Sequence, residues 1–203
     1  MTVSRKMSFS SIRFIMCILY FFSGVATLIY QIAWQRLLLT TLGIDFQSLT
    51  IMLSVIMCGL GIGAIGGGFL ADRLPTKLIG MFIFIEFAIA VFGFASPDII
   101  NAVINWTSAS GLSVSSFLVM ILPTMLMGAL LPVLVKCLND AEHNVGRSVS
   151  MLYFAFAFGG ACGAYVTGFI LLSVLDLVGV IACAAMMNLG IAIAAYLLLG
   201  RSE

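Results

Sequence analysis

Six long apolar runs divide the chain, and short polar or charged stretches separate them. A bilayer core about 30 Å thick requires roughly 20 apolar residues per helix, and each run is about that long. The pattern predicts six membrane-spanning helices near residues 14–35, 47–71, 78–95, 115–136, 149–174 and 177–199. We therefore expect an all-α membrane protein in which residues 1–203 form a single domain.

The composition supports this fold class and excludes several functions. The chain is 63% hydrophobic and 8% charged, whereas soluble domains carry about 25% charged residues. The net charge of +1, without a basic run, excludes nucleic acid as a partner and leaves the lipid bilayer. Five cysteines lie within or at the ends of apolar runs without Cys-x-x-Cys spacing, so we expect no metal and no cofactor.

The distribution of lysine and arginine predicts the orientation. With the N-terminus inside, a single basic residue, Arg36, falls in the outer segments. The inner segments then hold the other eight: Arg5, Lys6, Arg13, Arg73, Lys77, Lys136, Arg147 and Arg201. Because cytoplasmic loops are enriched in Lys and Arg, we expect both termini in the cytoplasm.

Glycines four residues apart mark the second and fifth runs: Gly59, Gly63 and Gly67 in one, and Gly159 and Gly163 in the other. Residues four apart share a helix face, and a face without side chains allows another helix backbone to approach closely. The two clusters lie about a hundred residues apart, each in the middle helix of a group of three. Since these middle helices run in opposite directions, we expect two inverted three-helix units.

A polar stripe follows one face of the first helix, at Ser23, Thr27, Tyr30, Gln31 and Trp34. These residues are spaced by three or four, so their side chains point the same way. Two interpretations stay open. The stripe forms hydrogen bonds between helices, with Trp34 at the membrane interface, or it lines a cavity.

Glu86 stands about eight residues into the third helix, roughly 12 Å from its inner end at 1.5 Å per residue. A charged side chain at that depth costs several kcal/mol, so we expect Glu86 to be neutral at pH 7 and hydrogen-bonded. The expected partners are Asn188, midway along the sixth helix, or Thr27, Tyr30 and Gln31 of the first. We take these five residues as candidates for a substrate or proton site.

Two helix ends carry further signals. Asp72 and Arg73 end the second helix, where the helix dipole favours a cation over an anion. We therefore expect the amides of another helix N-terminus, or a basic side chain, to hold Asp72. Ser96 followed by Pro97 predicts the start of a separate short surface helix that Trp106 anchors.

Several sequence blocks resemble known membrane families. Residues 67–77, GGFLADRLPTK, resemble the loop between the second and third helices of the major facilitator superfamily, with Pro75 where that pattern has glycine. The chain resembles more closely the membrane portion of bacterial membrane-bound spermidine-synthase-like proteins. The blocks that carry this likeness are 21–37, 122–132, Glu86 and its neighbours, 168–172 and 187–189. Gln31 stands where this family usually has glutamate, and Phe156 where asparagine is common.

The resemblance implies half of a major-facilitator bundle in the bacterial inner membrane, with Asp72 and Arg73 as an inner-side latch. It implies a homodimer, or a heterodimer with a similar half, through the glycine faces. The residues favour packing of these faces within one bundle almost equally. We expect a transporter-like function that moves a polyamine or another small amine. The alternative is a membrane anchor for a soluble aminopropyltransferase-like partner. We expect no enzymatic activity, because the chain ends at Glu203 without a nucleotide-binding domain.

Overall fold

The structure is a computed structural model that describes residues 9–42, 45–106, 112–142 and 145–200, and within these ranges it contains helices and no strand. Six helices are long and apolar enough to cross a membrane, which confirms the predicted fold class. They are α1 (Phe9–Leu42), α2 (Asp45–Arg73), α3 (Leu78–Trp106), α4 (Leu112–Glu142), α5 (Val145–Val166) and α7 (Leu177–Leu198). A 3-10 turn (Pro75–Lys77) joins α2 to α3. A π-helical turn (Thr167–Leu171) and the single turn α6 (Leu172–Val174) extend α5.

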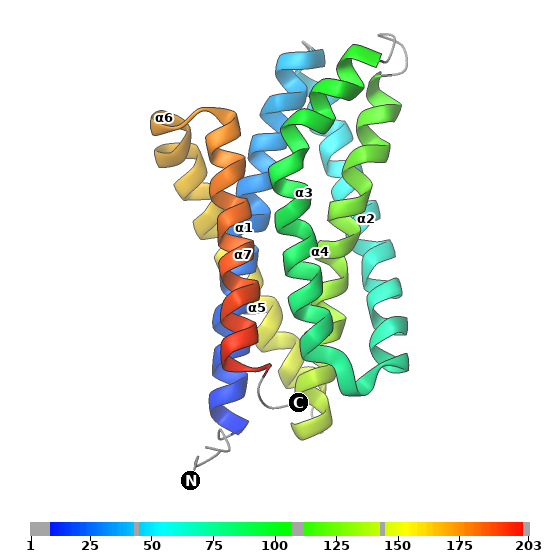
Figure 1. The fold of residues 1–203 in the computed structure, drawn as a ribbon, viewed down its shortest axis with the longest axis vertical. Coiled ribbons are helices and arrows are strands. Elements are labelled where there is room, and N and C mark those ends of the chain that lie inside the picture. The colour runs from blue at the N-terminus through cyan, green and yellow to red at the C-terminus, as the bar shows by residue number, and fades with distance from the viewer. Residues whose placement is uncertain (1–8, 43–44, 107–111, 143–144, 201–203) are drawn as a thin grey trace.

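The helices alternate in direction, so α1 begins and α7 ends at the same end of the bundle (Figure 1). Within the first unit, α1 and α3 run upward in this view and α2 runs downward. The second unit has the opposite pattern, since α4 and α7 run downward and α5 runs upward. The two groups of three helices therefore have opposite orientations, as the sequence predicted.

The packing of the helices has the symmetry of an inverted repeat. Exchanging α1 with α4, α2 with α5 and α3 with α7 converts the α2–α4 contact into the α5–α1 contact. The same exchange converts α3–α4 into α7–α1 and α1–α2 into α4–α5, while α3–α7 maps onto itself. The α3–α7 contact therefore lies where the two units meet.

Individual contacts follow the same symmetry. A Cβ added at Gly63 of α2 would overlap the backbone carbonyl of Met125 in α4. A Cβ added at Gly163 of α5 would overlap the backbone carbonyl of Val25 in α1. Gly163 stands 100 positions after Gly63, and Met125 stands 100 positions after Val25. The two units thus use corresponding residues for their closest backbone contacts.

The glycine faces are filled within the chain. Gly59 lies against the side chain of Thr124, and Gly67 lies against Ala129, both on α4. Gly159 lies against the backbone of Phe21 on α1. The expectation that these glycines form the contact with a second copy is therefore wrong. Close backbone packing stabilises the bundle itself, which was the other interpretation.

The third helix does not end before Pro97, so the predicted separate surface helix is wrong. Instead, α3 continues to Trp106, with Pro97 inside it. Proline cannot donate a hydrogen bond to the carbonyl four residues earlier, here that of Gly93. The Ser96 hydroxyl donates to that carbonyl at 2.9 Å and so satisfies the freed acceptor. Ser96 thus keeps the helix intact where the sequence suggested a helix cap.

Candidate functional site

Glu86 is fully buried on α3, with 0% of its surface exposed. Neither carboxyl oxygen has a hydrogen bond of good geometry among the described residues. The side chain of Ser23, from α1, lies beside the carboxyl group, and Tyr20 is near enough to interact with it electrostatically. The carboxyl group therefore lies near hydroxyl groups, and no basic side chain of the described part of the chain is paired with it.

The helices α1 and α3 run parallel, and their contacts keep a constant register. The indole nitrogen of Trp34 donates to the Ser96 hydroxyl at 3.0 Å, and the Tyr30 hydroxyl lies against Gly93. Residues paired in this way differ by 62 or 63 in number, and so do Ser23 and Glu86. This register places Ser23 at the level of Glu86. Trp34 is buried against α3, and its hydrogen bond to Ser96 is an interhelical bond of the kind that the first interpretation of the stripe predicted.

Tyr30 does not form the predicted hydrogen bond with Glu86, although the two side chains are near enough to interact electrostatically. Its hydroxyl occupies the space that Gly93 leaves open, and Gly93 lies seven residues, or about 10 Å, beyond Glu86. The Tyr30 hydroxyl is buried and has no hydrogen-bond partner among the described residues. The predicted hydrogen bond from Glu86 to Tyr30 is therefore wrong, although both side chains face the α1–α3 contact.

Thr27 and Gln31 belong to a different face of α1. Together with Thr124 and Met127 of α4, they line a space of about 10 Å³ between α1, α2 and α4. Both are half-buried, whereas Ser23 and Tyr30 are buried toward α3. The polar stripe therefore divides into two rows, and Thr27 and Gln31 form no hydrogen bond with Glu86.

Asn188 lies on α7 at about the level of Glu86. The neighbouring residues Phe87 and Leu189 line one groove between α3 and α7, and these two helices are antiparallel. Asn188 is buried, and its side-chain oxygen has no hydrogen-bond partner among the described residues. The expected hydrogen bond between Glu86 and Asn188 is absent, so this prediction is wrong. Both groups are nonetheless buried, on two helices that contact each other.

Asp72 has a basic partner, which its position at a helix end required. Lys136 Nζ of α4 donates to Asp72 Oδ1 at 2.9 Å, linking the ends of α2 and α4. The Asp72 side chain is 70% exposed, so water screens this ion pair. Arg73 stacks over the Phe69 ring at 4.1 Å and does not take part in the pair.

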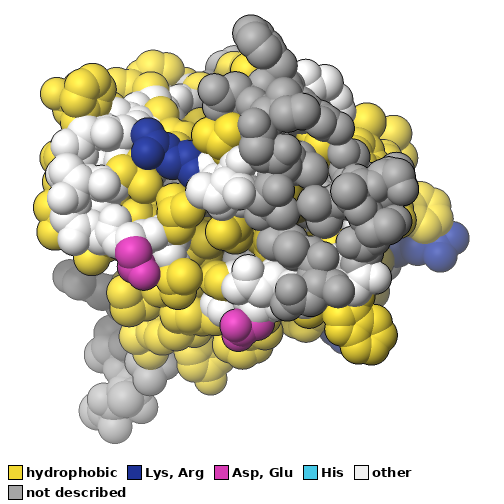
Figure 2. All heavy atoms as spheres, turned by 90° about the horizontal axis from the view of Figure 1, so that it is seen from above, with side chains coloured by type: hydrophobic (Ala, Val, Ile, Leu, Met, Phe, Trp, Pro, Cys, Tyr) yellow, Lys and Arg dark blue, Asp and Glu magenta, His cyan; other side chains and the backbone are white. Residues whose placement is uncertain are grey.

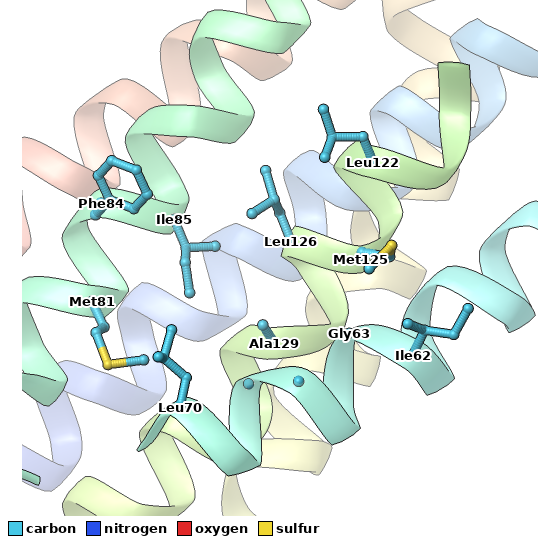
Figure 3. Close-up of a pocket in the computed structure, with 12 residues that line it drawn as sticks. Ile62, Gly63, Leu70, Met81, Phe84, Ile85, Leu122, Met125, Leu126 and Ala129 are labelled. Atoms are coloured by element: carbon cyan, nitrogen blue, oxygen red, sulfur yellow. The ribbon is translucent and has the colours of Figure 1, made fainter. Parts of the chain in front are cut away.

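A groove of about 260 Å³ runs between α2, α3 and α4 (Figure 3). Its lining consists of hydrocarbon side chains, two methionine sulfurs and glycines: Ile62, Gly63, Gly66, Gly67, Leu70, Met81, Phe84, Ile85, Leu122, Met125, Leu126 and Ala129. Ile85 faces this groove, whereas its neighbour Glu86 is buried elsewhere. A lining without hydrogen-bonding side chains does not suit a charged amine. The described residues also contain no cluster of metal-ligating side chains.

The comparisons with known proteins identify one curated relative. A polyamine aminopropyltransferase from Oceanobacillus iheyensis is 24% identical over 179 residues, and the match covers 87% of this chain. The chain is distantly related to this aminopropyltransferase. It spans about one third (34%) of that protein's length. No family model matches the chain, and no solved structure matches it. The relationship agrees with the resemblance in the sequence blocks and leaves the activity of this chain to be proposed.

Proposed function

We propose that this chain is one half of a membrane transporter for a small cationic amine, and that Glu86 is the residue that binds the amine. The observation that carries the proposal is a fully buried carboxyl group with no hydrogen bond of good geometry among the described residues, beside which the Ser23 hydroxyl is an interacting neighbour. Buried polar groups are nearly always paired, and ionisable residues inside membrane helices are usually functional.

The chemistry of the unpaired groups favours a cationic ligand. Both oxygens of Glu86 and the side-chain oxygen of Asn188 lack hydrogen bonds of good geometry among the described residues, and all three can accept hydrogen bonds. Ser23 supplies a hydroxyl oxygen beside them. A group with several hydrogen-bond donors and a positive charge would satisfy these acceptors, and a primary ammonium has both properties. Without such a ligand, Glu86 is expected to hold a proton.

The position of the site also supports transport. Transporters built from inverted repeats bind substrate near the middle of the membrane, where the repeats meet. Glu86 and Asn188 lie on α3 and α7, the two helices that the repeat exchanges and that contact each other. An amine can reach Glu86 only after the helices around it move apart, because the carboxyl group is fully buried. Such an opening is the motion that alternating access requires.

The relative suggests which amine to test. Its name describes an enzyme that acts on polyamines, so putrescine and spermidine are the first candidates. A single buried carboxylate matches one ammonium group of such a substrate. A second half would complete the transporter, and α2 and α5 have the most exposed surfaces on which it could pack. The second half would be another copy of this chain or a similar bundle.

A membrane anchor is the second candidate function, and the length of the relative favours it. The matched region covers 34% of the aminopropyltransferase, so that protein has much more chain than this bundle. In this case the bundle would hold a soluble aminopropyltransferase-like protein at the membrane and would itself neither catalyse nor transport. The basic residues at one end of the bundle, with Lys77 and Arg147 exposed, indicate a cytoplasmic side in a bacterial plasma membrane.

Uptake by the purified chain separates the two functions. Proteoliposomes that contain only this protein would receive radiolabelled putrescine or spermidine under an imposed membrane potential. We expect accumulation above that of protein-free liposomes, and competition by other primary amines. Uptake equal to that of protein-free liposomes would contradict transport. In that event, co-purification of an aminopropyltransferase from native membranes would support the anchor.

A further inference from the structure

The two ends of the bundle differ at positions that the repeat makes equivalent. At one end, Lys136 of α4 pairs with Asp72 of α2. A shift of 100 residues relates Lys136 to Arg36 of α1 and relates Asp72 to Leu172 of α6. Leu172 thus stands at the position equivalent to Asp72. Among the described residues, Arg36 therefore lacks the carboxylate partner that Lys136 has at the other end. Arg36 is exposed and has no ion pair within the described ranges 9–42, 45–106, 112–142 and 145–200.

A cavity of about 330 Å³ lies beside this arginine. One wall comes from α1, and the other comes from the turn between α6 and α7. The lining consists of one cation, one anion, one hydroxyl group and four leucines: Arg36, Asp176, Thr40, Leu39, Leu172, Leu175 and Leu177. Asp176 Oδ1 caps α7 by accepting a hydrogen bond from the Gly179 amide at 2.9 Å. The second carboxylate oxygen remains for another donor.

The cavity lies where two of the apolar spans end, which is where we expect the membrane–water boundary. Thr40 is the last residue of the first apolar span, and Leu177 is the first residue of the last one. The same end of the molecule, viewed in Figure 2, shows few charged side chains among many hydrophobic ones. The polar end of a ligand at this site would therefore contact one positive and one negative side chain, and the rest of the ligand would contact hydrocarbon.

We propose that this cavity binds the headgroup of a phospholipid with a primary amine, of the phosphatidylethanolamine type. Arg36 would hold the phosphate, since guanidinium groups match phosphate oxygens in charge and geometry. Asp176 would accept a hydrogen bond from the ammonium group, and the leucines would contact the start of the acyl chains. A lipid is the occupant because the site combines a membrane-boundary position with four leucine side chains, which a free phosphate compound does not need.

The pair of charges predicts selectivity among lipids. Phosphatidylcholine has the phosphate but no N–H group to donate to Asp176. Phosphatidylglycerol has no cation, and the Asp176 carboxylate would repel its net negative charge. Phosphatidylethanolamine alone among the three satisfies both side chains. This site lies apart from Glu86 and does not depend on the proposed transport.

Native mass spectrometry of the full chain with an equimolar mixture of the three lipids tests the site. We expect wild-type protein to retain phosphatidylethanolamine about threefold to tenfold more than the other two. Arg36→Gln should reduce retention of every phospholipid, whereas Arg36→Lys should restore part of it. Asp176→Asn should abolish the preference over phosphatidylcholine while α7 stays capped, because asparagine is also a good cap. Lys77→Gln, at the opposite end, serves as the matched control and should change nothing.

Two results would overturn this site. Unchanged phosphatidylethanolamine retention in both Arg36→Gln and Asp176→Asn would show that the cavity does not select the lipid. Displacement of the lipid by equimolar soluble glycerophosphoethanolamine would show that the acyl chains contribute nothing, and the lipid assignment would be wrong. Thermal unfolding of each variant in detergent would verify that the compared proteins are folded.

Discussion

The indole nitrogen of Trp34 donates a hydrogen bond to the Ser96 hydroxyl at 3.0 Å, and this hydroxyl donates in turn to the Gly93 carbonyl at 2.9 Å. Trp34 and Ser96 are both buried, so neither group can exchange its partner for water. The Ser96 hydroxyl thus accepts a hydrogen bond from the Trp34 N–H group of α1. It also donates one to the Gly93 carbonyl of α3, which Pro97 leaves without its helical donor.

Replacing Ser96 by alanine should therefore destabilise the bundle. The variant leaves the Trp34 N–H group and the Gly93 carbonyl unpaired, and such a loss typically costs about 1–3 kcal/mol. Denaturant unfolding in detergent micelles would measure the change. Ser173→Ala is the matched control, because the exposed Ser173 hydroxyl bonds only to the Ile170 carbonyl. Equal stability of the two variants would mean that the Trp34–Ser96 hydrogen bond contributes nothing.

Much of the fold was predictable because hydrophobic run length and glycine spacing are local signals. The six helices, their alternating directions and the small-residue faces all follow from such patterns. The end of the third helix was not predictable in this way. Ser96 before Pro97 is a typical helix start. In the structure the Ser96 hydroxyl instead bonds to the Gly93 carbonyl and to Trp34 of α1, and the contact with Trp34 is not visible in the local sequence.

The candidate site was predictable only in part. The sequence indicated that Glu86 and Asn188 would be deep in the membrane, and both are buried. The sequence could not indicate that the helix-one stripe divides, because Tyr30 and Gln31 are adjacent and their directions depend on which helices surround α1. Ser23 was part of the stripe, but its place beside Glu86 depends on the register between α1 and α3, which the sequence does not contain.

Enlarging Gly63 tests whether the glycine faces pack within one chain. Gly63→Leu should destabilise the protein by about 1–3 kcal/mol or more, since the side chain would collide with the α4 backbone. Gly61→Leu on the same helix is the control, because no atom lies within 4 Å of a Cβ added there. Thermal unfolding and mass in mild detergent would be measured together. A Gly63→Leu protein that is fully folded but loses a partner copy would contradict packing within the chain.

The ion pair between Lys136 and Asp72 should contribute little to stability. Exposed pairs are typically worth less than about 1 kcal/mol, so Asp72→Asn should unfold at nearly the same temperature as the parent. The small difference should vanish in high salt, which screens exposed charges. Asp98→Asn removes an exposed carboxylate of α3 and provides the control. If Asp72→Asn reduces amine uptake without changing stability, the pair has the latch role that the sequence resemblance implies. Unchanged uptake would exclude that role.

Cysteine labelling tests the orientation. In a background without the five native cysteines, Thr76→Cys and Asn101→Cys would place exposed thiols near opposite ends of α3. A membrane-impermeant maleimide added to intact cells should label only the second variant, because the basic residues favour a cytoplasmic position for the first. After permeabilisation both should react. The reverse pattern in intact cells would invert the orientation.

Amine uptake by Glu86→Gln tests the proposed binding site most directly. Glutamine keeps the shape and the hydrogen-bonding capacity of the side chain but can neither carry a negative charge nor exchange a proton. Proteoliposomes with the parent, with Glu86→Gln and with the Ser173→Ala control would be compared for initial rates of labelled putrescine uptake. We expect the control to match the parent and the folded glutamine variant to lose at least about tenfold in rate, the effect of roughly 1.4 kcal/mol. Uptake by Glu86→Gln at the parent's full rate would show that Glu86 is structural and that the amine does not bind there.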